Sequence, residues 1–131
     1  MRAIDTNVLI RLFVNDDSEQ HHTVKNFFAN LKDTEQVYVS LVVVTELVWV
    51  LESGYAQSKD VIVQILGALL ETAQLSFQNS IALADALSLY KNGADFADSL
   101  ITAQAADAGC LETLTFDKKA AKKAGMTLLA V

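Results

Sequence analysis

Hydrophobic and polar positions along this chain change repeatedly between the spacing of strands and the spacing of helices. Short apolar runs bounded by polar or turn-forming residues predict strands at 3–4, 37–39, 75–77, 111–116 and 127–131. Apolar residues at helical spacing predict helices between them, at 8–14, 18–31, 41–53, 58–71, 80–92, 95–109 and 118–124. Strands that alternate with helices indicate an α/β fold, here a three-layer α/β/α sandwich with a mainly parallel five-stranded sheet.

Residues that favour helix ends mark several of these boundaries. Ser18 and Ser40 can cap the helices that follow them, and either Asn79 or Ser80 can cap the helix at 80–92. Gly54 is expected to end the helix at 41–53. The boundaries therefore rest on end signals as well as on periodicity.

Composition indicates one globular domain over residues 1–131. The chain is 52% hydrophobic and has no proline, which argues against disorder and against a linker between domains. Its single cysteine, Cys110, cannot form an internal disulfide, and we expect it to be a small buried residue in a reducing compartment. No basic segment precedes an apolar core at the start, and no apolar run reaches the roughly 18 residues that span a bilayer. We therefore expect a cytoplasmic protein without a membrane segment.

The net charge narrows the kind of nucleic-acid contact that the chain can make. A formal charge of −6 argues against a protein that coats nucleic acid by neutralising phosphates. The charge does not exclude an enzyme that holds phosphate through metal ions, because carboxylates then bind the cation and the cation meets the phosphate.

Four acidic residues are the candidate site. Asp5 follows the first predicted strand and Asp117 follows the fourth, so both are expected at the C-terminal edge of the sheet, where open α/β folds bind ligands. The helices that start at this edge include those that carry Glu46 and Asp98. The topology thus predicts that the four carboxylates converge.

Each candidate also has a plain structural interpretation. Glu46 interrupts an almost entirely apolar helix, where a carboxylate needs a cation or hydrogen-bond donors, unless it lies on a narrow solvent-facing stripe with Ser53. Asp95 and Asp98 share a face of a first helical turn, where both favour the positive end of the helix dipole. A dense basic segment is either a solvated helix face or a surface that attracts phosphate; its members are Lys118, Lys119, Lys122 and Lys123.

Four segments, in this order, resemble the acidic motifs of PIN-domain ribonucleases, and in particular VapC-type toxins of bacterial toxin-antitoxin pairs. They are 3–10 (AIDTNVLI), 44–47 (VTEL), 94–101 (ADFADSLI) and 114–117 (LTFD). Each motif alone is weak, but four together are specific, and they span nearly the whole chain. The resemblance implies a sheet order of 3-2-1-4-5, a homodimer, and a small antitoxin whose C-terminal segment covers the acidic pocket.

The resemblance also implies an activity and a division of roles. It implies a metal-dependent endoribonuclease in which one or two Mg²⁺ or Mn²⁺ ions are bound by Asp5, Glu46, Asp98 and Asp117. Asp95 corresponds to a less uniformly used acidic position, and three further residues match positions that orient the carboxylates or a metal-bound water: Thr6, Asn7 and Thr115.

The chemistry of the residues is consistent with this activity. Crowded carboxylates repel one another unless hard divalent cations hold them, and oxygen ligands without His or Cys suit Mg²⁺ or Mn²⁺. Two ions roughly 4 Å apart can activate a water and stabilise the leaving oxygen of a phosphodiester. The expected products carry 5′-phosphate and 3′-hydroxyl ends.

Two other functions remain open from the sequence. A Mg²⁺-dependent aspartate phosphotransfer or phosphatase domain also places an aspartate at a strand end, but the segment Asp5-Thr6-Asn7 lacks the second aspartate that such phosphatases have two residues after the nucleophile. A non-catalytic PIN-like module that binds RNA or protein would keep the fold without cleavage, although all four acids are present.

Overall fold

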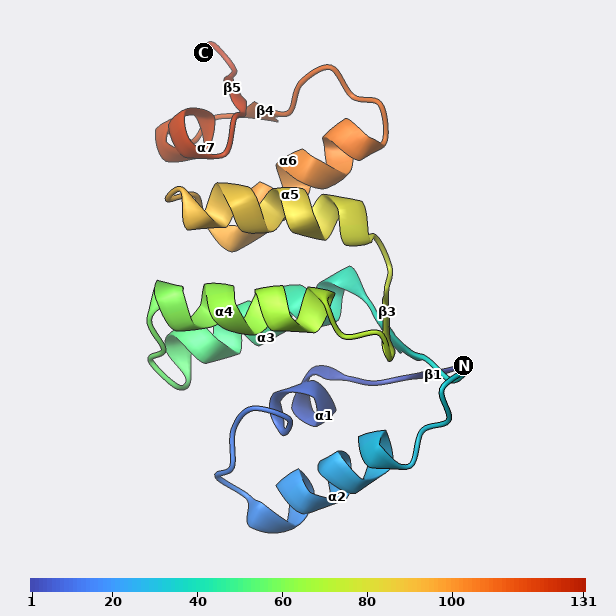
Figure 1. The fold of residues 1–131 in the computed structure, drawn as a ribbon. Coiled ribbons are helices and arrows are strands. Elements are labelled where there is room, and N and C mark those ends of the chain that lie inside the picture. The colour runs from blue at the N-terminus through green and yellow to red at the C-terminus, as the bar shows by residue number, and fades with distance from the viewer. The chain divides into compact units, whose positions relative to one another are not determined.

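The computed structural model describes residues 1–131 as seven helices and five strands (Figure 1). They form two compact units, each described by itself. The N-terminal unit comprises residues 1–56 and 68–78, and the C-terminal unit comprises residues 57–67 and 79–131. Helix α4 (Lys59–Leu70) contributes residues to both units. No helix is both long and apolar enough to cross a membrane.

The N-terminal unit contains a three-stranded parallel sheet. Its strands are β1 (Arg2–Ala3), β2 (Val37–Val39) and β3 (Leu75–Phe77), in the order β1-β2-β3. Arg2 pairs with Val37, and Val37 in turn pairs with Leu75. This order agrees with the 3-2-1 part of the expected sheet. All the strands point the same way, so their C-terminal ends lie at one edge.

Three helices complete the N-terminal unit: α1 (Thr6–Ile10), α2 (Ser18–Ala29) and α3 (Leu41–Ser53). Helix α3 buries Val44, Leu47, Val48 and Leu51, whose spacing of three and four residues places them on one face. Helices α1 and α3 contact each other. The first two motifs are therefore carried by helices that touch.

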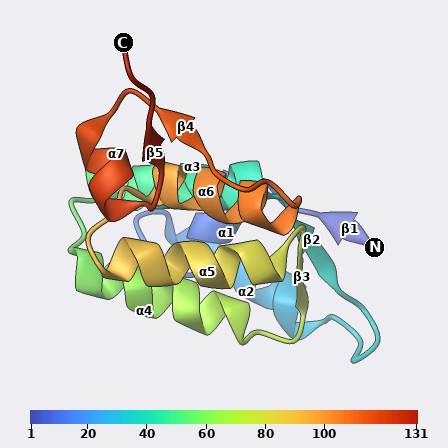
Figure 2. The same cartoon turned by 90° about the horizontal axis from the view of Figure 1, so that it is seen from above.

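The C-terminal unit is built on the helix pair α5 (Ser80–Lys91) and α6 (Phe96–Asp107), which lie side by side (Figure 2). Tyr90 and Phe96 fix the connection between them with an edge-to-face ring contact of 5.6 Å between centroids. After α6 the chain forms β4 (Leu114–Thr115), α7 (Lys118–Lys123) and β5 (Thr127–Leu128), with the two strands parallel. Helix α7 packs its alanine face, Ala120 and Ala124, with Ala94 and Met126.

The predicted α/β class is confirmed: strands and helices alternate, and every strand pair is parallel. The five strands are divided between a three-stranded sheet in the N-terminal unit and a two-stranded sheet in the C-terminal unit, so one five-stranded sheet stays a prediction. Some boundaries differ. Helix α1 begins at Thr6 instead of residue 8, because Asp5 caps it. Asp17 caps α2 in place of Ser18, since its carboxylate accepts a hydrogen bond from the Gln20 amide at 3.0 Å. The predictions of Ser40 and Asn79 as caps are confirmed.

Two other expectations on the C-terminal side of the chain were wrong. Strand β4 covers only residues 114–115 of the predicted 111–116, because α6 ends in a turn at Gly109, at φ 92°, and the ladder with β5 begins at the Thr113 carbonyl, which accepts a hydrogen bond from the Thr127 amide at 2.8 Å. Cys110 follows that glycine and is exposed instead of buried.

Candidate active site

Asp5 lies between β1 and α1, at the C-terminal edge of the sheet. Its Oδ1 accepts a hydrogen bond from the Val8 amide at 3.0 Å and thereby caps α1. The residue is exposed, and Oδ2 accepts no hydrogen bond within the protein. One carboxylate oxygen is thus fixed by the helix start, and the other is open to a cation.

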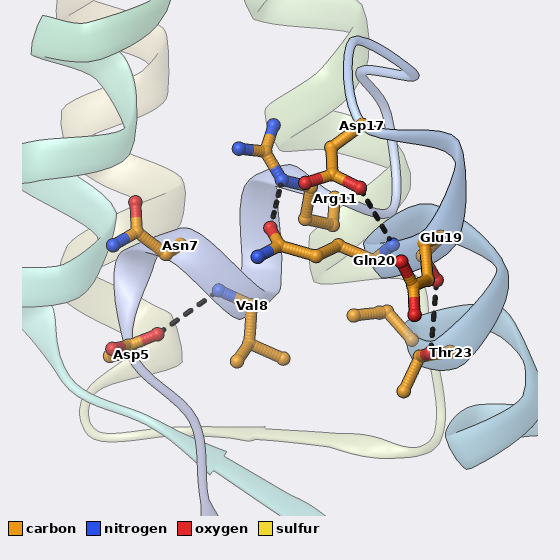
Figure 3. Close-up of a pocket in the computed structure, with 9 residues that line it drawn as sticks. Asp5, Asn7, Val8, Arg11, Asp17, Glu19, Gln20 and Thr23 are labelled. Atoms are coloured by element: carbon orange, nitrogen blue, oxygen red, sulfur yellow. Dashed lines mark hydrogen bonds between the residues drawn. The ribbon is translucent and has the colours of Figure 1, made fainter.

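A cavity of about 540 Å³ opens beside Asp5 between α1 and α2 (Figure 3). Asp5 and Asn7 line one side of it, and residues of α2 line the other. Arg11 is the cation on its wall, and its position is fixed by a hydrogen bond from Nε to Gln20 Oε1 at 2.9 Å and by an ion pair with Asp16. The predicted supporting residue Asn7 therefore adjoins both Asp5 and a cavity, and sequence analysis missed Arg11, whose only signal was a basic residue directly after an apolar run.

Glu46 is exposed on α3, which corrects the expectation of an apolar environment. It lies on a solvent-facing stripe with Val42, Trp49 and Ser53; Val42 and Trp49 are 67% and 66% exposed. The alternative interpretation of a solvent-facing stripe is therefore confirmed. The carboxylate needs no cation to offset burial, but it is accessible to one.

Asp95 and Asp117 both lie within electrostatic reach of Asp98 in the C-terminal unit, and we call these three carboxylates the acidic cluster. Asp95 caps α6, and its Oδ2 accepts a hydrogen bond from the Asp98 amide at 3.0 Å. The fully buried Ser99 donates its hydroxyl to the Asp95 carbonyl at 2.6 Å and fixes this helix start. Sequence analysis missed Ser99, whose signal was a hydroxyl residue four positions after the cap.

Asp117 caps α7 and is oriented from both sides. Its Oδ1 accepts hydrogen bonds from the amides of Lys119 at 2.8 Å and Ala120 at 3.1 Å. Its own amide donates to Thr115 Oγ1 at 3.0 Å. Thr115 therefore orients the Asp117 backbone, and its predicted role toward the carboxylates or a metal-bound water stays a prediction.

The charges of the acidic cluster act on one another. The pKa of the half-buried Asp98 is raised above its ordinary value of 3.8, first by desolvation and then by the negative charges of Asp95 and Asp117, while Lys119 opposes the shift. Repulsion of this kind favours a bound proton or a bound cation. An all-carboxylate donor set with this repulsion fits a hard divalent ion such as Mg²⁺ or Mn²⁺.

The four predicted metal ligands are divided between the two units. Asp5 and Glu46 lie on contacting helices of the N-terminal unit, and Asp98 and Asp117 interact electrostatically in the C-terminal unit. Neither unit brings three or more His, Cys, Asp or Glu side chains into a group of metal-binding geometry. The complete constellation of four carboxylates remains a prediction.

Comparison with known proteins covers residues of both units. The sequence model of the family described as PIN domain matches residues 3–126, a range that includes all four acidic motifs. A VapC ribonuclease of Aquifex aeolicus (strain VF5) is 28% identical over 121 residues, which cover 91% of this chain and 89% of that protein.

Proposed function

The chain belongs to the PIN-domain family, and from this membership we propose that it is a metal-dependent endoribonuclease that hydrolyses RNA phosphodiester bonds. The family match crosses both units, which supports one PIN domain over residues 1–131. The similarity to a VapC ribonuclease supports RNA as the substrate.

The observation that carries the proposal is the electrostatic interaction within the acidic cluster. The Asp98 amide donates a hydrogen bond to Asp95 Oδ2, and the pKa of Asp98 is raised first by desolvation and then by the charges of Asp95 and Asp117, so a bound cation would stabilise its ionised form. We propose that Asp98 and Asp117, together with Asp5 and Glu46, hold one or two Mg²⁺ or Mn²⁺ ions.

When bound, such ions would supply an activated water and stabilise the leaving oxygen. The chain's own residues would orient the ligands. The α1 amide of Val8 fixes Asp5, the α7 amides fix Asp117, and Asp95 fixes the start of α6 next to Asp98. Thr6 and Asn7 follow Asp5 in the first turn of α1, and we propose that they help to orient its carboxylate or a water.

The test is cleavage of a labelled single-stranded RNA by the purified protein. We expect Mg²⁺ or Mn²⁺ to support hydrolysis into fragments with 5′-phosphate and 3′-hydroxyl ends, and excess EDTA to abolish it. Metal binding should also raise the midpoint of thermal unfolding, because an ion that binds only the folded state stabilises it. Cleavage that continues undiminished in EDTA would contradict metal dependence, and fragments with cyclic phosphate ends would contradict the proposed chemistry.

A second prediction concerns the basic helix. All four lysines of α7 are exposed, and none forms an ion pair with an acidic side chain. We propose that α7 attracts the RNA backbone through those lysines that border Asp98 and Asp117. Joint replacement of all four lysines by alanine should weaken RNA binding and lower the logarithmic slope of its salt dependence by about 0.7 for each lost phosphate contact. An unchanged slope in a salt titration would identify α7 as an ordinary solvated face.

The biological setting is also a proposal. The similarity to a VapC ribonuclease supports a cytoplasmic toxin that pairs with a small antitoxin, and the family resemblance supports a homodimer. Co-expression with a small antitoxin encoded next to this protein should yield a complex that suppresses cleavage. Light scattering of the free protein measures the oligomeric state.

A further inference from the structure

We propose that the two α7 faces have different roles: Lys119 and Lys123 hold RNA phosphates at the acidic cluster, whereas Lys118 and Lys122 face away from this contact. The inference rests on the proposed ribonuclease function and identifies which side of α7 the substrate follows. The basic patch therefore consists of one lysine pair that binds RNA and a second pair of equal charge that does not.

Helical geometry separates the four lysines into two pairs. Residues four apart share a face, so Lys119 lies above Lys123, and Lys118 lies above Lys122. The buried alanine face is made by Ala120 and by Ala124, which caps the helix. At 100° per residue, Lys119 and Lys123 lie about 100° from this face, whereas Lys118 and Lys122 lie about 160° from it, on the opposite side of α7.

Lys119 interacts with the acidic cluster through its backbone amide and through the charge of its side chain. Its amide donates to Asp117 Oδ1 at 2.8 Å. Its ammonium group opposes the effect of the neighbouring acids on Asp98, which places the side chain within electrostatic reach of that carboxylate. No acidic oxygen lies within ion-pair distance of the ammonium, so the group is available to a phosphate.

Lys123 extends along the connection that leads into α6. A Cβ built on Gly93 would lie 3.7 Å from Lys123 Cδ and 3.8 Å from Nζ. Gly93 has φ +110° and stands two residues before Asp95, the cap of α6. The end of the Lys123 side chain therefore lies beside the loop that starts the acidic cluster, one helical turn from Lys119.

The charges explain why a phosphate fits between these groups. A metal ion on the carboxylates would hold one phosphate, and two unpaired ammonium groups beside the carboxylates offer the next phosphates a positive site. The chain as a whole has a formal charge of −6, so local cations are needed to guide a polyanion to this edge. Lys118 and Lys122 add the same charge to the molecule but lie on the side of α7 opposite its buried alanine face.

The experiment compares two double variants of equal charge. Lys119→Ala with Lys123→Ala should raise the KM for a single-stranded RNA by at least about tenfold and lower the salt slope of binding by about 1.4. Lys118→Ala with Lys122→Ala removes the same charge from the same helix and should change KM less than about threefold. Replacement of Lys119 and Lys123 by Arg should preserve binding, because Arg keeps the charge.

A second measurement separates this inference from the proposed activity. Affinity for the same RNA is measured by anisotropy in the Asp5→Asn background, with no need for cleavage. Equal losses in the two double variants, with cleavage by the parent intact, would overturn the inference alone. Unequal losses without any cleavage by the parent would support the inference and contradict the ribonuclease proposal. No RNA binding by the parent would overturn both.

Discussion

Asp5→Asn is expected to lower RNA cleavage by more than about 100-fold without unfolding the protein. Asparagine keeps a side-chain oxygen that can accept the hydrogen bond from the Val8 amide, now 3.0 Å from Asp5 Oδ1, so α1 keeps its cap. The substitution removes the negative charge that a divalent ion requires of its ligand. Loss of a supporting residue around a metal already costs about 10- to 100-fold, so loss of a ligand should cost more. Single-turnover cleavage and thermal unfolding measure the two effects.

Asp17→Asn is the matched control for this substitution. Asp17 caps α2 as Asp5 caps α1, with its Oδ1 also 3.0 Å from a backbone amide, that of Gln20. It also lines the same cavity. We expect Asp17→Asn to retain cleavage within a few-fold. Equal losses in both variants would assign the effect to helix capping or to the cavity, and a fully active Asp5→Asn protein would contradict the metal-ligand role.

Local chemistry explains how much of the fold could be predicted from the sequence. Ser40, Asn79 and Asp95 cap helices because a side-chain oxygen meets a free backbone amide within three residues, an interaction that sequence spacing reveals. Asp17 and Ser18 can both act as caps, and adjacent candidates of this kind cannot be ranked from propensity alone. The cap therefore lies one residue before the predicted one, and α2 begins at Ser18.

Burial was harder to predict than periodicity. Helix α3 is apolar almost all round, so the sequence does not show which stripe lacks a packing partner, and Glu46 was expected in apolar surroundings. The tertiary fold leaves that stripe open, with Val42 and Trp49 exposed beside Glu46. Cys110 was assigned to the core on its residue type, but it follows the glycine turn at the end of α6.

In the candidate site too, contacts between residues close in sequence could be predicted, whereas contacts between distant segments could not. The proximity of Asp95 and Asp98 followed from helical spacing, and the hydrogen bond between them agrees. The interaction of Asp98 with Asp117 depends on the packing of segments about twenty residues apart, which spacing does not determine. The four lysines were recognisable as a basic patch, but only the packing of α7 shows which pair borders the acids.

Asp98→Asn is expected to abolish cleavage and, in the absence of metal, to stabilise the protein. The raised pKa means that folded Asp98 binds a proton more tightly than unfolded Asp98 does. Between the ordinary value of 3.8 and the raised value, the folded state therefore holds more protons, and the free energy of unfolding falls as pH rises. Asparagine is neutral at every pH and avoids this loss. In EDTA, the variant should have the higher midpoint of thermal unfolding. The difference between the two midpoints should grow as pH rises from about 4 and become constant above the raised pKa of Asp98.

Added Mg²⁺ should reverse this order, because the parent gains stability from the bound ion and the variant has lost a ligand. Asp107→Asn is the control on the same helix: Asp107 accepts a hydrogen bond from Asn79 Nδ2 at 2.8 Å and belongs to no acidic group of the proposed site. It should keep cleavage and gain no stability in EDTA. An Asp98→Asn protein that is less stable than the parent in EDTA would mean that this carboxylate supports the start of α6, and the metal site would then have to lie elsewhere.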